Sequence, residues 1–229
     1  MIKEKKNNTY IYFNNDSKNI YKDFKNKNFK IIKNLKDDKR SLVQLISIKN
    51  KKYILKIPRE KNIRKWQRFM SLFRGGESQR EFKNLKNIQK LGFNCPKPFF
   101  ALERKKFGMT FFSFLISEYI DGKESSLDEL ELVVEMLTEI HNHGFLHGDS
   151  QLTNFIISNN KVFLIDSKFS KNIYGKFGSA YEFIYLEESC NKDLKNYFNK
   201  NTFFYKGAKL LNTYLHWWGR FRKKIRNKD

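Results

Sequence analysis

The sequence predicts an α+β chain with a strand-rich first half and a second half built on helices and a hairpin. Residues 1–120 hold several short segments of alternating apolar and polar residues, which is typical of strands. Apolar residues recur at helical spacing from Leu127 to Ile140, behind the capping-box sequence Ser126–Glu129. Asn159-Asn160 then joins two short apolar segments, Phe155–Ser158 and Lys161–Ile165, which indicates a hairpin. The two halves meet near residues 118–122.

Six strands and one helix are expected in the first half. The strands are Tyr10–Phe13, Phe29–Asn34, Ser41–Ile48, Lys52–Ile57, Phe99–Glu103 and Phe111–Tyr119. The turn at 49–51 makes a hairpin of two of them, and Pro58 ends the second. Glu77–Leu91 reads as a helix that closes at Gly92. Residues 17–27 read as a polar helix or a loop.

Composition narrows the classes of protein and of partner. The 229 residues carry 46 Lys and Arg against 24 Asp and Glu, which gives a net charge of +22. Hydrophobic residues make up 40%, so the chain is not a disordered polycation. The charge favours an anionic partner: nucleic acid, nucleotide, phosphorylated glycan or an acidic membrane surface. Two distant cysteines indicate a reducing compartment, and we expect neither a signal peptide nor a membrane span.

The stretch most informative about chemistry runs from His147 to Asn154. Its form H-x-D-x-x-x-x-N resembles the catalytic loop of the protein-kinase-like superfamily, and Asp166 follows at the far end of the hairpin. A carboxylate must face the attacking hydroxyl, while an amide and a second carboxylate hold Mg²⁺ against the phosphates. This assigns Asp149 and Asn154 as catalytic residues, together with the upstream Lys56, and Asn154 and Asp166 as metal ligands. Ordinary loop residues are the alternative, but the order of helix, loop, hairpin and acid favours the kinase interpretation.

The superfamily also predicts a lysine for the α- and β-phosphates of ATP. Lys56 ends the apolar run Tyr53–Leu55 and is the best candidate. Its ion-pair partner should lie in the next helix, where Glu81 is preferred and Glu77 is the second choice. Residues 115–122 resemble the hinge, with adenine bound by backbone groups of Glu118 and Ile120. This fold would have two lobes: residues 1–120, an antiparallel sheet with one helix and the basic insert 58–76, and residues 121–229, a mostly helical, shortened lobe.

Two features depart from protein kinases. The turn at 35–40 has no glycine, although a glycine loop normally lets backbone N–H groups approach the phosphates. Here Lys36, Lys39 and Arg40 are candidate replacements. Asp166 is followed by Ser167-Lys168 rather than Phe-Gly, and the remaining chain is short for a peptide-binding platform. A small or glycan hydroxyl is therefore the expected acceptor.

Three histidines lie close together in sequence at 141, 143 and 147, and they could indicate a metal site. No fourth ligand is evident near them. We therefore expect structural roles, in which His147 braces the catalytic loop and His141 caps the end of the preceding helix.

Several flanking segments resemble one family of small kinase-like enzymes, the lipopolysaccharide core heptose kinases of the WaaY (RfaY) type. They are Pro98–Lys105, Ile116–Gly122, Gly148-Asp149, Asn154–Ser158, Ile165-Asp166, the basic aromatic insert and the short basic C-terminus. The resemblance implies phosphorylation of a heptose hydroxyl of the inner core, with ATP and Mg²⁺. It implies work in the cytoplasm of a Gram-negative bacterium, at the inner face of the inner membrane.

The basic segments rich in aromatic residues, 59–74 and 203–226, fit a peripheral contact with anionic lipid. Packing of these aromatic residues in the protein core is the equally weighted alternative. Three other interpretations stay open: a kinase for Kdo, an aminoglycoside or a protein; a non-catalytic membrane-binding module; or a nucleic-acid-binding module. No RNA- or DNA-binding motif appears, so nucleic acid is disfavoured as a partner.

Overall fold

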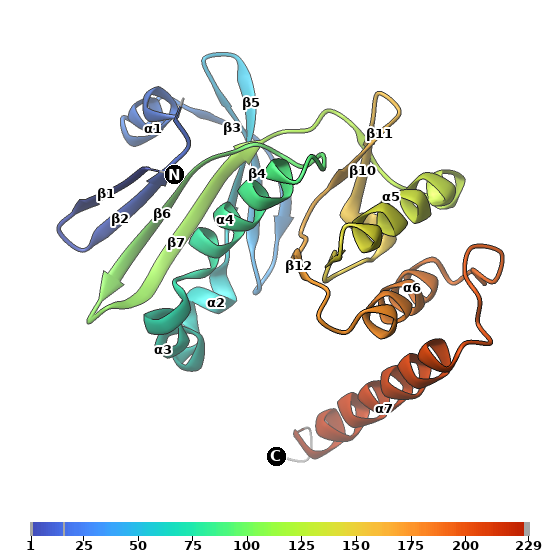
Figure 1. The fold of residues 1–229 in the computed structure, drawn as a ribbon. Coiled ribbons are helices and arrows are strands. Elements are labelled where there is room, and N and C mark those ends of the chain that lie inside the picture. The colour runs from blue at the N-terminus through green and yellow to red at the C-terminus, as the bar shows by residue number, and fades with distance from the viewer. Residues whose placement is uncertain (1, 16, 227–229) are drawn as a thin grey trace. The chain divides into compact units, whose positions relative to one another are not determined.

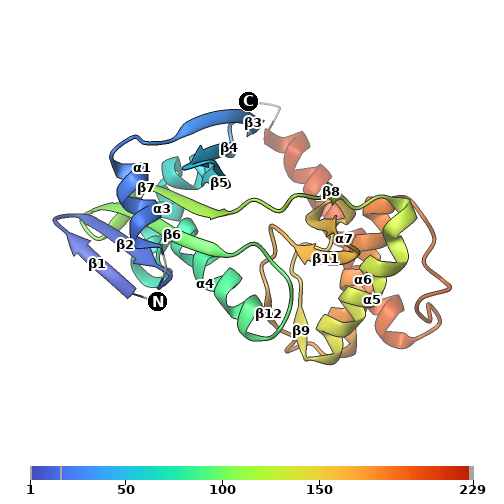
Figure 2. The ribbon, with the colours of Figure 1, turned by 90° about the horizontal axis from the view of Figure 1, so that it is seen from above.

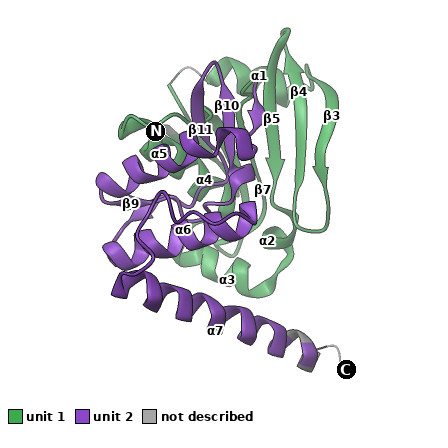
Figure 3. Cartoon of the chain, turned by 90° about the vertical axis from the view of Figure 1, so that its right-hand side faces the viewer, with its two compact units in different colours: residues 1–121 green, residues 122–229 purple. Residues whose placement is uncertain are grey.

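A computed structural model describes residues 2–15 and 17–226. The chain forms two compact units, Met1–Asp121 and Gly122–Asp229 (Figure 3). The expected junction after residue 120 is adjacent to this division. No helix in the described part of the chain is long and apolar enough to cross a bilayer.

A seven-stranded antiparallel sheet is the centre of the first unit, in the order β1-β2-β6-β7-β5-β4-β3 (Figure 1). Its strands are β1 (Ile2–Lys6), β2 (Thr9–Phe13), β3 (Lys30–Asp37), β4 (Leu42–Ile48), β5 (Lys51–Ile57), β6 (Pro98–Lys106) and β7 (Met109–Glu118). The six strands expected from sequence are confirmed. Strand β1 was not predicted, because its sequence is mostly charged. It is an edge strand, where lysines are favoured because they discourage pairing with another chain.

Each face of this sheet is covered by a helix. Helix α1 (Lys18–Lys25) packs the rings of Tyr21 and Phe24 onto Phe100, with centroid distances of 5.4 and 5.8 Å. Helix α4 (Glu77–Lys90) contacts β6 and β7 (Figures 1 and 2). There the Ser78 hydroxyl donates to Ser113 Oγ of β7 over 3.0 Å. Because side chains alternate along a strand, β7 supplies Ser113 to α4 and its neighbour Phe114 to the aromatic core.

The basic insert folds as two short helices before α4. They are α2 (Arg59–Ile63) and α3 (Lys65–Arg74). Gly75, with a φ of 76°, ends α3, and Gly76 is the N-cap of α4. The left-handed backbone at Gly75 is the conformation that glycine adopts without a steric penalty, so it allows the sharp change of direction between the two helices.

The second unit combines helices with short strands. Its elements are β8 (Lys123–Glu124), η1 (Leu127–Glu129), α5 (Leu130–Asn142), β9 (Phe145–Leu146), η2 (Leu152–Asn154), β10 (Phe155–Ser158), β11 (Lys161–Leu164), β12 (Ser170–Lys171), α6 (Lys176–Cys190) and α7 (Phe203–Arg226). The capping box is confirmed: Ser126 Oγ accepts from Asp128 N, and Glu129 accepts from Ser126 N over 2.9 Å. The hairpin β10–β11 is also confirmed.

Helix α6 was not predicted from sequence. It packs against α7 through Ile184, Tyr205 and Ala208, which are all buried. Apolar residues occur around most of the circumference of α6 rather than along one stripe, so its sequence shows no clear helical period. Beyond Asn212, the aromatic residues of α7 are exposed.

Candidate active site

Lys56 of β5 pairs with Glu81 of α4. Lys56 Nζ lies 2.8 Å from Glu81 Oε1, and both side chains are about one-fifth exposed, at 22% and 21%. Alternation along β5 buries Leu55 in the aromatic core and turns Lys56 toward the face that α4 covers. Glu77, the second candidate, instead pairs with Lys61. The geometry therefore selects Glu81 as the partner that holds the Lys56 ammonium.

The hinge candidates Glu118 and Ile120 lie at and just beyond the end of β7. The Glu118 N–H donates to the Lys97 carbonyl over 2.9 Å, and Glu118 Oε2 accepts from Lys97 N over 3.0 Å. The N–H of Glu118 is thus already engaged within the protein. Contact of these two residues with adenine stays a prediction, and at Glu118 it would involve the carbonyl.

Side chains hold the glycine-free turn between β3 and β4. Asp38 Oδ1 accepts from the backbone N–H groups of Arg40 and Ser41, each over 2.7 Å. These two bonds lower the pKa of the Asp38 carboxyl, and the bond from Ser41 has the larger effect. Arg59, the first residue of α2, donates to Asp37 Oδ1 over 2.5 Å and to the Asp38 carbonyl over 3.1 Å. The turn is therefore fixed by an aspartate from within and by an arginine from α2.

Asp149 lies in the loop after β9, and its carboxylate has two polar neighbours. Gln151 Nε2 donates to Asp149 Oδ1 over 3.2 Å, and Lys168 Nζ lies 3.8 Å from Oδ2. The carboxylate is one-quarter exposed, so it can meet a ligand. Gly148 precedes it with a φ of 82°, and a Cβ there would lie 2.9 Å from the Lys168 carbonyl. Only glycine fits this close approach. In sequence, Lys168 was noted only as a departure from Phe-Gly.

Asn154 and Asp166 flank the open end of the β10–β11 hairpin. The Ile165 N–H donates to the Asn154 carbonyl over 3.0 Å, which holds the two flanking segments together. Asn154 Nδ2 donates to the Asp149 carbonyl over 2.8 Å, so the amide oxygen is the atom that remains suited to a cation. Asp166 has a φ of 50°, in the left-handed region that aspartate tolerates better than most residues. An amide oxygen and a carboxylate are the donor types that Mg²⁺ prefers.

Glu182 of α6 anchors the catalytic loop, and sequence reasoning missed it. Its side chain is buried. Oε2 accepts from His147 N over 2.9 Å and lies 3.0 Å from His141 Nε2, while Oε1 accepts from Gly148 N. Ser150 Oγ donates to the Glu182 carbonyl over 2.8 Å. The one signal in sequence is an acid inside the otherwise uncharged stretch 177–186.

The histidines make hydrogen bonds within the protein, and one predicted role is wrong. His141 does not cap α5; its Nε2 bonds Glu182, and His143 Nδ1 lies 2.9 Å from the Glu139 carbonyl instead. His143 can reach this carbonyl because it lies one turn beyond Glu139. Among residues 2–15 and 17–226, no three His, Cys, Asp or Glu side chains gather closely enough to bind a metal ion.

His147 braces the catalytic loop, as predicted. Its Nδ1 accepts from Asp149 N over 3.3 Å, and its carbonyl accepts from Ser167 Oγ over 2.7 Å and from Lys168 N over 2.9 Å. Burial lowers the pKa of the imidazole to about 4. The neutral ring therefore bonds the loop at Asp149, while the backbone carbonyl of His147 bonds the segment after Asp166.

A model of the family described as "Lipopolysaccharide core biosynthesis protein (WaaY)" matches residues 1–205. The chain belongs to this family. A relative from Escherichia coli K12 named "Lipopolysaccharide core heptose(II) kinase WaaY" is 32% identical over 177 residues, covering 72% of this chain and 76% of the relative. A second Escherichia coli protein of that name is 27% identical over 169 residues, with coverage of 69% and 73%. The resemblance inferred from the flanking segments is thereby confirmed.

The fold of the present chain is similar to that of a solved structure described as "WaaP in complex with acyl carrier protein". The two align with a TM-score of 0.57 and 14% identity, over 94% of this chain and 98% of the other. This likeness concerns the fold alone. The α+β fold expected from sequence, with an antiparallel sheet in the first unit and a mostly helical second unit, is confirmed.

Proposed function

We propose that this protein transfers the γ-phosphoryl group of ATP to a heptose hydroxyl of the lipopolysaccharide inner core. One observation carries the proposal: a complete Asp149, Asn154 and Asp166 set in a chain that is 32% identical to a curated heptose(II) kinase. A degenerate scaffold that only binds lipid or nucleic acid would have no need of all three residues.

Asp149 orients the sugar hydroxyl and accepts its proton late in a loose transition state. Two contacts support this role, because Gln151 and Lys168 flank the two oxygens of the carboxylate and limit its rotation. Glu182 fixes the backbone at Gly148, one residue before the carboxylate. The loop is therefore organised before the substrate arrives, which removes an ordering cost from the chemical step.

Lys56, held by Glu81, binds the α- and β-phosphates of ATP, and adenine lies against Glu118 and Ile120. Asn154 and Asp166 would hold Mg²⁺, which supplies positive charge to the phosphate oxygens. The ion pair supports this assignment, because the carboxylate holds the Lys56 ammonium in one position and compensates its partial burial.

We also propose that the protein works at the cytoplasmic face of the inner membrane, where a lipid-linked core would be presented. The exposed aromatic residues of α7 support this placement: Tyr214, Trp217, Trp218 and Phe221 are each more than one-third exposed. Basic residues such as Arg220 and Arg222 lie among them. Aromatic rings with Lys and Arg are what an interfacial helix presents to anionic lipid.

Labelled ATP with Mg²⁺, offered to four acceptors, tests the proposed function. The acceptors are under-phosphorylated lipopolysaccharide core, a Kdo glycolipid without heptose, an aminoglycoside and a generic protein. We expect label on the first acceptor only, at a heptose. Label on the Kdo glycolipid, the aminoglycoside or the protein, with none on the heptose core, would reject the proposed acceptor while retaining the kinase assignment.

A further inference from the structure

Helix α3 of the insert presents an aromatic face to solvent. Trp66, Phe69 and Phe73 are 65%, 45% and 76% exposed. Their rings still contact one another, with centroids 5.9 Å apart for Trp66 and Phe69 and 5.7 Å apart for Phe69 and Phe73. Three adjoining exposed rings on a ten-residue helix form an apolar surface that water solvates poorly.

The opposite side of α3 is fixed to the sheet. Ser71 is buried, and its hydroxyl accepts from the Thr110 N–H of β7 over 2.8 Å and donates to the Arg68 carbonyl over 2.6 Å. Successive residues of a helix are about 100° apart around its axis. This rotation places Ser71 roughly opposite the three aromatic residues. The aromatic face is therefore held outward by the packing of α3.

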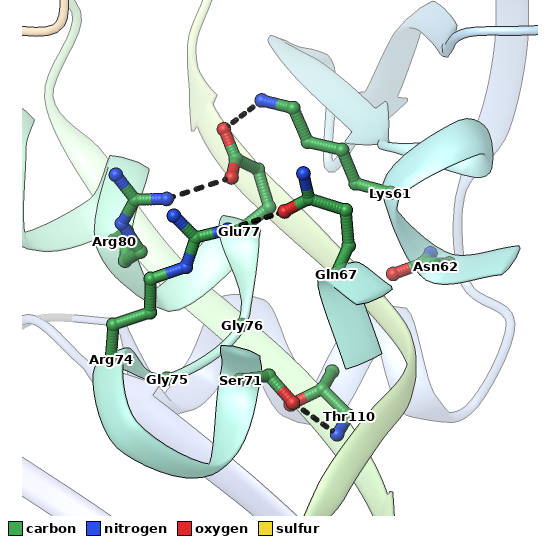
Figure 4. Close-up of a pocket in the computed structure, with 10 residues that line it drawn as sticks. All are labelled: Lys61, Asn62, Gln67, Ser71, Arg74, Gly75, Gly76, Glu77, Arg80 and Thr110. Atoms are coloured by element: carbon green, nitrogen blue, oxygen red, sulfur yellow. Dashed lines mark hydrogen bonds and ion pairs between the residues drawn. The ribbon is translucent and has the colours of Figure 1, made fainter. Parts of the chain in front are cut away.

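A basic pocket lies where α3 meets α4 (Figure 4). Lys61, Arg74 and Arg80 line it, and Glu77 is the single carboxylate among its lining residues. Glu77 pairs with Lys61 and, over 3.3 Å, with Arg80, while the guanidinium of Arg74 donates to the neutral amide oxygen of Gln67. Three cations against one carboxylate leave a net charge of +2. Arg74 and Arg80 are exposed, so an incoming anion can reach both.

The floor of this pocket is polar and includes a buried acid, Glu103. Gly76 starts α4, whose first-turn N–H groups carry partial positive charge. A Cβ at Gly76 would lie 2.3 Å from Glu103 Oε1 and 2.9 Å from Thr110 Oγ1, so glycine is needed for this close approach. Thr110 is 4% exposed, and its Oγ1 has no hydrogen-bond partner within the described residues. Because the buried Glu103 carboxylate lies beside this hydroxyl, the floor does not attract an anion, and the exposed guanidinium groups of Arg74 and Arg80 at the mouth of the pocket are the groups that can bind one.

We propose that the insert binds a lipid-borne phosphate: the α3 aromatic face enters the membrane interface while Arg74, Arg80 and Lys61 hold the phosphate. Guanidinium groups bind phosphate through paired hydrogen bonds, which suits the two arginines. The adjoining aromatic face selects a phosphate attached to lipid over a free one. The inference rests on the proposed function, in which the substrate is borne by a membrane.

Binding to vesicles tests the phosphate site directly. The probe is phosphatidylcholine vesicles containing phosphatidic acid, with the full-length protein and without ATP. We expect Arg74→Ala/Arg80→Ala to weaken binding roughly tenfold or more, since each base near the surface contributes about 1 kcal/mol. Lys30→Ala/Lys33→Ala is the matched control, because it removes the same charge from the exposed strand β3. An equal loss in the control would overturn the site and leave only general electrostatic attraction.

Fluorescence tests the aromatic face independently. The chain has three tryptophans, so Trp217→Phe/Trp218→Phe leaves Trp66 as the sole reporter. We expect lipids with brominated acyl chains to quench it, and unquenched emission on bound vesicles would contradict the inference. Transfer to a lipid-free core oligosaccharide should persist in Arg74→Ala/Arg80→Ala. Absence of that transfer in the parent protein would count against the proposed function and not against this lipid site.

Discussion

Glu182 holds the loop of Asp149 in place but does not itself contact the substrate in the proposed mechanism. Its replacement should therefore disturb this loop. Its two carboxylate oxygens face three nitrogen groups, so Glu182→Gln would place an amide NH₂ against at least one backbone N–H. We expect a loss of roughly 2–3 kcal/mol in the free energy of unfolding, the cost of leaving buried partners unsatisfied. The turnover number should fall while the KM for ATP changes little. Glu135→Gln, at an exposed position of α5, is the control for both measurements.

His147 should make the stability of the protein depend on pH. The pKa of its imidazole is about 4 in the folded chain, against an ordinary value near 6.5. Below pH 6.5 the unfolded chain takes up a proton that the folded chain refuses until about pH 4. The stability linked to this group is therefore complete above pH 6.5 and declines by roughly 3 kcal/mol as pH falls to 4.

Denaturant unfolding of the parent and of His147→Gln at pH 7.5 and 4.5 measures this effect. We expect the parent to lose more stability than the variant between the two pH values. The same loss in both proteins would show that His147 is not the group responsible.

At the level of single residues, sequence nominates candidates where chemistry depends on spacing along the chain. Asp149 and Asn154 share one loop, and Lys56 follows an apolar run, so each is a candidate from sequence alone, and its role stays a prediction. Glu182 was not a candidate, because its hydrogen bonds span more than thirty residues of chain and follow no local pattern. The choice between Glu81 and Glu77 required the register of α4 on the sheet, which sequence does not supply.

At the level of elements, Arg59 of α2 holds the turn between β3 and β4. Arg59 donates to Asp37 and to the backbone of Asp38, and we expect Arg59→Ala to raise the KM for ATP several-fold by loosening the turn over the phosphates. The free energy of unfolding should change by less than about 1 kcal/mol, because the pair is exposed to solvent. The swap Arg59→Asp/Asp37→Arg should restore part of the KM. An unchanged KM in Arg59→Ala would contradict a role of the Arg59–Asp37 pair in ATP binding.

Elements with a local signal were predicted, and the others were not. The hairpin β10–β11 has asparagines at both turn positions, with φ of 49° and 56°, as that turn requires. Strand β1 lacked such a signal because it is charged. Helix α6 lacked it because its apolar residues do not lie on one stripe. Strand β1 is stabilised by pairing with β2, and α6 by packing against α7, and neither contact leaves a periodic signal in the sequence.

At the scale of the whole molecule, part of the net charge of +22 lies among the aromatic residues of the basic tail, residues 203–226. The aromatic residues of the basic tail could have packed in the core or faced lipid. The structure buries Tyr205 and exposes those beyond Asn212. We expect Tyr214→Ser/Trp217→Ser/Trp218→Ser to reduce sedimentation with anionic vesicles while leaving the thermal midpoint Tm nearly unchanged.

Tyr205→Ser is the contrasting variant for the tail. This side chain is buried against α6, so its truncation should lower stability by about 3 kcal/mol. If the triple variant destabilises the protein as much as Tyr205→Ser does, the exposed rings have a structural role and the membrane role of α7 is contradicted.

The proposed phosphoryl transfer depends on the Asp149 carboxylate. The measurement is transfer of labelled phosphate from ATP to under-phosphorylated lipopolysaccharide core by the parent protein and by Asp149→Ala. We expect the variant to transfer phosphate roughly 10²- to 10⁴-fold more slowly, which is the contribution typical of a positioned acid–base group. ATP binding and the fold should be retained. Transfer at an unchanged rate in a folded Asp149→Ala protein would contradict the account.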